Sequence, residues 1–219
     1  MKEYSENVFF HGFYLQNTKI IETIADRNDW FPSVINTFQP QIKTEGIFKE
    51  SLIFENFKIR NGKFPNIKQQ KHPIDQISYD KLSKYLINYL DLLQDTTGWN
   101  FSLEERKEYF LKAFNFWYSI LVNRDISLFV SLANPHTPTC YLIYLICKEV
   151  LNIKVLFFDA APLFNNRMHL VRTTYSSDIN EYIKRNIDSN LFPKEKKNSY
   201  LKFINNYLGS IKNANSPSH

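Results

Sequence analysis

Glycine is scarce in this chain, and its scarcity argues against two common kinds of nucleotide site. Only 5 of the 219 residues are glycine, and neither a G-x-G-x-x-G nor a G-x-x-x-x-G-K-[ST] pattern occurs. Both patterns depend on glycine because the backbone must come close to the phosphates. The sequence therefore disfavours a dinucleotide-binding enzyme and a P-loop enzyme.

Cysteine is scarcer still, with two residues in the whole chain. Cys140 and Cys147 lie in one apolar helical stretch, about two turns or roughly 10 Å apart along the axis, which is too far for a disulfide. The sequence has no C-x-x-C pattern of the kind that binds metals. We expect both thiols to pack as small apolar side chains in a reducing compartment, and we expect neither a metal nor an organic cofactor.

Long apolar runs are also missing. The longest one, Tyr141 to Cys147, is far shorter than the roughly 20 residues that span a bilayer, and the N-terminus is charged. These features predict a cytoplasmic protein. Peripheral contact with the inner face of the cell membrane stays open.

The net charge of +5 comes from 27 basic and 22 acidic residues. One reading is an ordinary solvated surface, with a local lysine cluster at 194–197. The other is contact with anions such as sugar nucleotides, acidic glycans or an anionic membrane. We expect no nucleic-acid partner, because no basic stripe alternates with aromatic residues in a known motif.

Two stretches alternate between strand and helix patterns. The first places strands at 8–13 and 33–38 around a helix at 18–27. The clearer one places strands at 126–132 and 153–158 around a buried helix that Thr137 and Pro138 begin. Strands that are apolar at nearly every position are covered on both faces, as in a parallel sheet. The sequence therefore predicts a three-layer α/β fold, Rossmann-like, with helices on both faces.

The rest of the chain completes one predicted domain, residues 1–212, followed by a disordered tail at 213–219. Two helices follow residue 77, the first capped by Ser78 and the second by a Ser102–Glu105 capping box. The segment from about 39 to 77 lacks a clear period, and we expect an irregular insertion with short helix there.

Ligands of open parallel sheets bind beyond the carboxyl ends of the strands, so the candidate residues are those that follow predicted strands. They are His11, Gly12, Asn134, His136, Thr137, Asp159 and Arg167. His136 stands beside a helix N-terminus, which favours anions. The alternative for His11 and for His136 is a histidine that only stabilises a turn.

Three further residues have two readings each. Asp159 is the best-placed carboxylate for acid–base work, or it is a cap or turn residue. Arg167 can hold a carboxylate or phosphate through two hydrogen bonds, or it is a surface arginine. Tyr141 follows the His136 turn on the predicted helix and can face a ligand, whereas we expect Tyr144 in the core.

The stretch NPHTPTCYLIYLICKEVLNIKVLFF, followed by APLFNNR, resembles bacterial capsular and surface polysaccharide biosynthesis proteins. The matching positions are Pro135, His136, Tyr144, Ile153 and Arg167. The resemblance implies a glycosyltransferase with two Rossmann-like domains, the GT-B arrangement, of which this chain would be the N-terminal, acceptor-side half. It also implies a sugar nucleotide or glycan acceptor as ligand.

A half of this kind needs a second domain or partner subunit to hold the donor, so the chain is expected to be a fragment, a truncated member or a domain that works with a partner. In that setting His136 and Asp159 would be catalytic. The other candidates would bind substrate: His11, Gly12, Asn134, Thr137, Tyr141 and Arg167. The alternative function is a non-catalytic α/β binding or scaffold module.

Overall fold

The computed structural model describes residues 4–13, 18–38, 45–67, 71–97, 101–132, 135–160 and 168–171. All of them belong to the first of two compact units, Met1–Thr174. The predicted part of the domain beyond residue 174 and the predicted tail at 213–219 lie outside the described residues.

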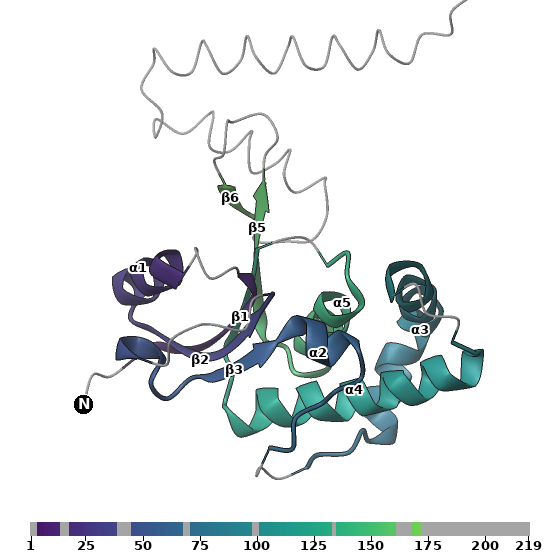
Figure 1. Ribbon diagram of the computed structural model, residues 1–219. Coiled ribbons are helices and arrows are strands. Elements are labelled where there is room, and N and C mark those ends of the chain that lie inside the picture. The colour runs from purple at the N-terminus through teal and green to yellow at the C-terminus, as the bar shows by residue number, and fades with distance from the viewer. Residues whose placement is uncertain are drawn as a thin grey trace, which may run out of the picture. The chain divides into compact units, whose positions relative to one another are not determined.

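The strands of this part of the chain form one sheet in the order β3-β2-β1-β4-β5-β6 (Figure 1). Strands β1 to β5 are all parallel, and β6 adds to β5 in the antiparallel direction. The strands are β1 Glu6–Phe13, β2 Trp30–Thr37, β3 Leu52–Glu55, β4 Leu128–Ser131, β5 Lys154–Ala160 and β6 Met168–Val171. The predicted Rossmann-like parallel sheet is confirmed.

Helices cover the sheet on both sides, with α1 on one face and the longer helices on the other (Figure 1). They are α1 Thr18–Asn28, α2 Asn56–Arg60, α3 Gln76–Thr97, α4 Leu103–Asn123 and α5 Pro138–Leu145. A 3-10 turn, η2, spans Gly46–Phe48, and α5 continues as a π-helical turn, η3, at Ile146–Val150. No helix in the described ranges is long and apolar enough to cross a membrane.

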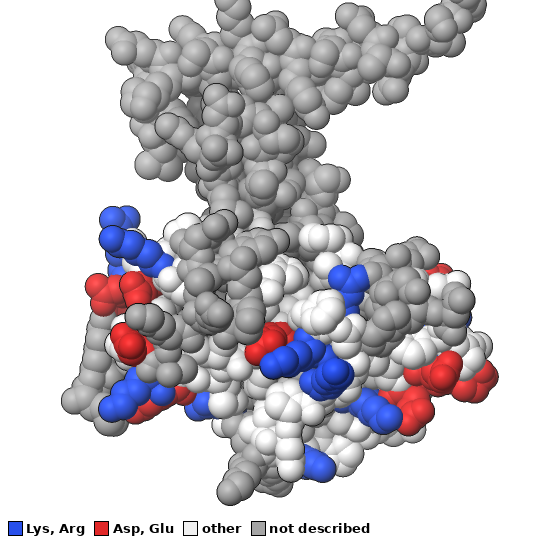
Figure 2. All heavy atoms as spheres, viewed as in Figure 1, with Lys and Arg blue, Asp and Glu red and all other residues white. Residues whose placement is uncertain are grey.

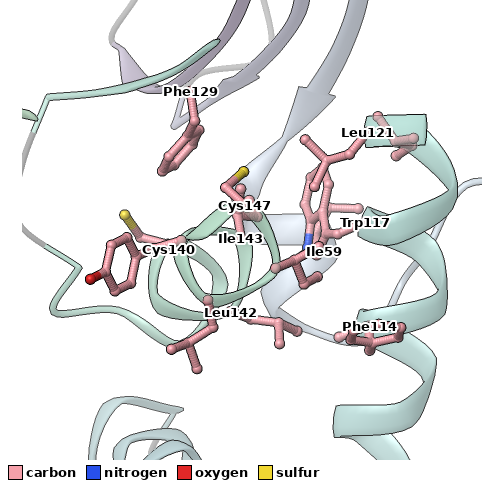
Figure 3. Close-up of a cluster of buried hydrophobic side chains, with 14 of the residues drawn as sticks. Ile59, Phe114, Trp117, Leu121, Phe129, Cys140, Leu142, Ile143 and Cys147 are labelled. Carbon is pink, nitrogen blue, oxygen red and sulfur yellow. The ribbon is translucent and has the colours of Figure 1, made fainter. Parts of the chain in front are cut away.

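The larger core lies between the sheet and helices α2 to α5. Figure 3 shows Trp117 of α4 and Ile143 of α5 pointing into the same cluster as Phe129 of β4. Both cysteines belong to it: Cys140 and Cys147 are free and at most 2% exposed. Burial raises the pKa of Cys140 to about 12, so its thiol stays protonated. The expectation that the cysteines are apolar packing residues is confirmed.

Local sequence signals explain two helix starts. The Ser102 hydroxyl accepts from the Glu105 backbone N–H at 3.2 Å, and the Glu105 carboxylate accepts from the Ser102 N–H at 2.8 Å. The Thr137 hydroxyl caps α5 by accepting from the Cys140 N–H, and Pro138 takes the first helical position. Both predicted caps are confirmed.

Two expectations need correction. Ser78 does not cap α3; its backbone N–H donates to the Asp75 carboxylate at 2.6 Å, because the helix begins earlier, at Gln76. The segment 39–77 also contains a strand, β3, which was not expected, whereas α2 agrees with the short helix predicted there. The strand has four residues and passes directly into the helix, which leaves too few positions for either period to show.

Candidate functional site

The strand order places a topological switch point between β1 and β4. From β1 the chain moves outward on one side to β2 and β3, and from β4 it moves outward on the other side to β5. The two connections therefore leave in opposite directions, and ligands of open parallel sheets bind at such a point, beyond the carboxyl ends of β1 and β4. His11 belongs to the end of β1, and His136 follows β4.

A row of buried polar side chains crosses the sheet at this edge. His11 pairs in register with Asn36 of β2 on one side and with Ser131 of β4 on the other. The side chains of this polar row are at most 2% exposed. Two residues earlier on the same face stand apolar residues of the large core: Phe9, Val34 and Phe129. The core face of the sheet thus turns polar where a ligand would bind.

Hydrogen bonds tie the polar row to the start of α2. The Asn36 side-chain Nδ2 lies 3.1 Å from His11 Nδ1 and 3.1 Å from Asn56 Oδ1. Asn56 is the first residue of α2 and is 4% exposed. The remaining amide atom, Asn36 Oδ1, is buried without a partner in the described structure. An unsatisfied buried polar atom is costly, so a ligand or water that reached it would gain a strong contact.

Burial lowers the pKa of His11 from 6.5 to about 3, and the nearby charge of His136 contributes in the same direction. His11 is therefore neutral at physiological pH. With Asn36 donating to Nδ1, the ring proton belongs on Nε2. His11 can thus offer an N–H donor from Nε2.

Gly12 shapes the backbone beside His11. Its φ of +80° lies in the region that favours glycine, and the pairing of β1 with β2 skips it, from His11–Asn36 to Phe13–Thr37. The result is a bulge at the carboxyl end of β1. Gly12 therefore bends the strand next to the switch point. Its predicted contact with a ligand stays a prediction.

His136 is exposed and directly precedes the Thr137 cap of α5. β1 and β4 are adjacent and parallel, so the end of β1, with His11, and the turn after β4, with His136, belong to the same edge of the sheet. That the two histidines act in one site stays a prediction. Thr137 lies at the same edge, but its hydroxyl already accepts a bond within the helix cap.

Tyr141 is half-buried and stacks on Tyr144, with ring centroids 6.5 Å apart and planes 24° apart. It packs against the large core, as Tyr144 does. Tyr144 is 7% exposed and its hydroxyl accepts from Lys148 Nζ at 3.0 Å. The expected core position of Tyr144 is confirmed, and Tyr141 lies close to it.

Three of the predicted site residues have no described side chain. Asn134 and Arg167 lie outside the described residues. Asp159 was expected to end its strand, but β5 continues to Ala160 and Asp159 pairs with His169 of β6. The antiparallel strand β6, which sequence periodicity did not predict, extends the ladder past the expected stop.

The sequence reading missed Asn36, Asn56 and Ser131. Asn36 carried a usable signal, since it follows Val34 and Ile35 in a predicted strand and shares a face with Val34, where a core residue is expected. Asn56 and Ser131 carried none, because asparagine at a helix start and serine at a strand end are ordinary.

Basic and acidic side chains are interspersed on the face of the molecule shown in Figure 2. The positive net charge is therefore not gathered into a single-sign field on that face. In the described ranges no three His, Cys, Asp or Glu residues group together as a metal site. No family model, curated protein or solved structure matches the chain.

Proposed function

We propose that the switch point between β1 and β4 forms a crevice that binds a sugar nucleotide or glycan acceptor, and that the chain is a glycosyltransferase-like domain of bacterial surface polysaccharide synthesis. The supporting observation is the position of His11 and His136 on the two sides of the switch point, where ligands of such sheets bind. The sequence resemblance around Pro135 and His136 supplies the substrate class.

The two histidines would have different roles. His11 is buried, neutral and oriented by Asn36, which suits a fixed donor to a sugar hydroxyl or phosphate oxygen. His136 is exposed beside the start of α5, which suits contact with the reacting group. Two further roles remain predictions from the sequence: Asp159 as acid or base, and Asn134 and Arg167 as ligand contacts.

An aromatic ring near the polar row favours a ligand that contains a ring. Phe38 follows β2, is 38% exposed, and has its ring centroid 6.3 Å from that of His11. Such a ring can pack against the apolar face of a sugar or the plane of a base.

The alternative is a binding module without catalysis. The described side chains around His11 are amides and a hydroxyl, groups that bind a ligand without moving protons at neutral pH. A neutral His11 whose Nδ1 is already engaged also suits binding. This alternative requires the same crevice and differs only in what His136 does.

Calorimetric titration tests the proposal, with UDP-glucose, UDP-N-acetylglucosamine, GDP-mannose and CMP-sialic acid as donors and short glycans as acceptors. We expect at least one probe to bind and His11→Gln to weaken it by about tenfold, the equivalent of one buried hydrogen bond to a charged group. The matched control is His72→Gln, on the segment packed against α4. An affinity that is the same for His11→Gln as for the unchanged protein would contradict the proposed site.

A second measurement separates transfer from binding. Donor turnover in the presence of acceptor, with and without a candidate second subunit, should fall in His136→Ala more than affinity does if His136 acts on the reacting group. Unchanged turnover alongside normal binding would favour the non-catalytic module.

A further inference from the structure

A cavity lies between α4 and the segment that follows α2, away from the carboxyl ends of β1 and β4. Its volume is about 550 Å³, within the usual range of small-molecule sites. The described lining residues are 64–67, 71 and 73 after α2, and five residues of α4 between 112 and 120. None of them belongs to the polar row or its neighbours, so this cavity stands independently of the function proposed above.

The cavity has an apolar floor. The rings of Phe64 and Phe116 lie 5.1 Å apart and tilt by 49°, and Ile67 and Ile120 add aliphatic surface. The ring centroid of Phe116 in turn lies 4.8 Å from that of Trp117, a residue of the large core. A ligand would therefore meet a rigid hydrophobic wall continuous with the protein interior.

The segment over the cavity is held in place by α4. Asn115 Oδ1 accepts from the Ile74 backbone N–H at 2.9 Å, and Ser119 Oγ accepts from the His72 N–H at 2.8 Å. Pro73 fixes the backbone between them. These bonds fix the position of residues 72–74 against α4 before any ligand binds, which lowers the cost of ordering this part of the lining.

The same bonds decide which polar chemistry the cavity offers. The acceptor atom of Asn115 is occupied, and its Nδ2 can only donate. Lys71 and Lys112 add two ammonium groups, and none of the described lining residues is acidic. Lys112 also pairs with Glu108 at 2.7 Å, but both side chains are more than 60% exposed, so that pair is weak and easily shared. The cavity is therefore complementary to a ligand that carries an acceptor-rich or anionic head group on an apolar body.

We propose that this cavity, the α4 pocket, binds a single-chain anionic amphiphile, with its apolar chain against Phe64 and Phe116 and its carboxylate or phosphate head beside Lys71 and Lys112. Apolar burial would supply most of the affinity. The lysines and the Asn115 amide would select an anionic head over a neutral one.

Calorimetry on the full chain tests the proposal with four probes below their micelle concentrations: decanoate, decyl phosphate, decanol and inorganic phosphate. We expect one site for decanoate or decyl phosphate, about tenfold weaker binding of decanol, and no measurable binding of phosphate alone. Whichever of decanoate and decyl phosphate binds more tightly identifies the preferred head group. Equal binding of decanol and decanoate would overturn the proposal, as would an absence of binding by both charged probes.

Charge reversal locates the site without touching the core. Lys71→Glu combined with Lys112→Glu should weaken decanoate binding by about tenfold or more, whereas Lys107→Glu, exposed on the same helix and outside the lining, should leave it unchanged. Equal effects of both changes would mean non-specific attraction and would overturn the assignment. Decanoate should also shift the NMR signals of Phe116 and Ser119, and shifts confined elsewhere would overturn it too.

A second copy of the chain is the main competing occupant. Sedimentation of the chain alone, before and after decanoate is added, distinguishes the two. A monomer in both states agrees with the proposal. A dimer that decanoate or the double lysine variant dissociates would assign the pocket to a self-association surface instead.

Discussion

The two faces of the sheet are alike in the middle of the strands and differ at the carboxyl ends. Toward α1, β1 ends in Phe13 and Leu132 follows β4, both in the smaller core, and the buried Thr37 at the end of β2 donates its hydroxyl to the Phe13 carbonyl at 2.7 Å. Toward α2 to α5, the next inward position in each central strand is polar, which gives the polar row of His11, Asn36 and Ser131. Apolar packing and one hydroxyl bonded to the backbone account for the first face. Packing does not account for three buried polar side chains side by side, and we propose that this asymmetry marks the face where a ligand binds.

The largest effect should come from the layer beneath the polar row. Phe9 is fully buried, with its ring centroid 5.5 Å from that of Phe129 and 5.4 Å from that of Trp117. Phe9→Ala should lower the free energy of unfolding by about 3–5 kcal/mol, measured by urea denaturation. Phe10→Ala, on the other face, should cost a similar amount because Phe10 is equally buried.

Ligand binding then separates the two variants. Phe9→Ala removes the support of the polar row and should weaken binding by the folded protein, whereas Phe10→Ala should leave it nearly unchanged. Equal binding losses, measured by calorimetry at a temperature where both variants are folded, would show that the two faces do not differ in function.

The pH dependence of stability should show the next largest effect. Unfolded His11 binds a proton as pH falls below about 6.5, but folded His11 does not until about pH 3, so the unfolded state holds more protons in between. Stability should therefore fall as pH falls, by about 1.4 kcal/mol per unit from this residue. Between pH 6.5 and 4.5 the free energy of unfolding of His11→Gln should therefore fall less steeply, by about 1.4 kcal/mol per pH unit. Parallel curves would mean that His11 is not held neutral by burial.

Sequence periodicity predicted most of the parallel strands and the helix starts, because neighbouring residues encode buried strands and helix caps. The Thr137–Pro138 helix start and the Ser102 capping box are of this kind. The strand β3 was missed because its pairing with β2 is a long-range contact that four residues cannot signal.

The site was predictable only in part, for the same reason. His11 and His136 were found because each follows an apolar strand, and strand ends meet at one edge. Asn36 and Asn56 become site residues only through their bonds with each other and with His11, across 20 and 25 residues of chain. No local pattern encodes the partner of a buried amide, so the network that orients His11 needed the fold.

The smallest effect, and the sharpest test of the comparison, comes from adjacent residues of β2 that face opposite ways. Asn36→Ala should cost about 1–3 kcal/mol because it leaves the buried His11 Nδ1 and Asn56 Oδ1 unpaired. Ile35→Val, facing α1, should cost about 0.5–1.5 kcal/mol. Asn36→Leu combined with His11→Phe should recover the part of the loss that comes from His11, since only Asn56 Oδ1 is then left unpaired, yet abolish ligand binding. A stable double variant that still binds the ligand would show that the polar row is a packing feature, and recovery of stability without binding would show that its polarity is kept for function.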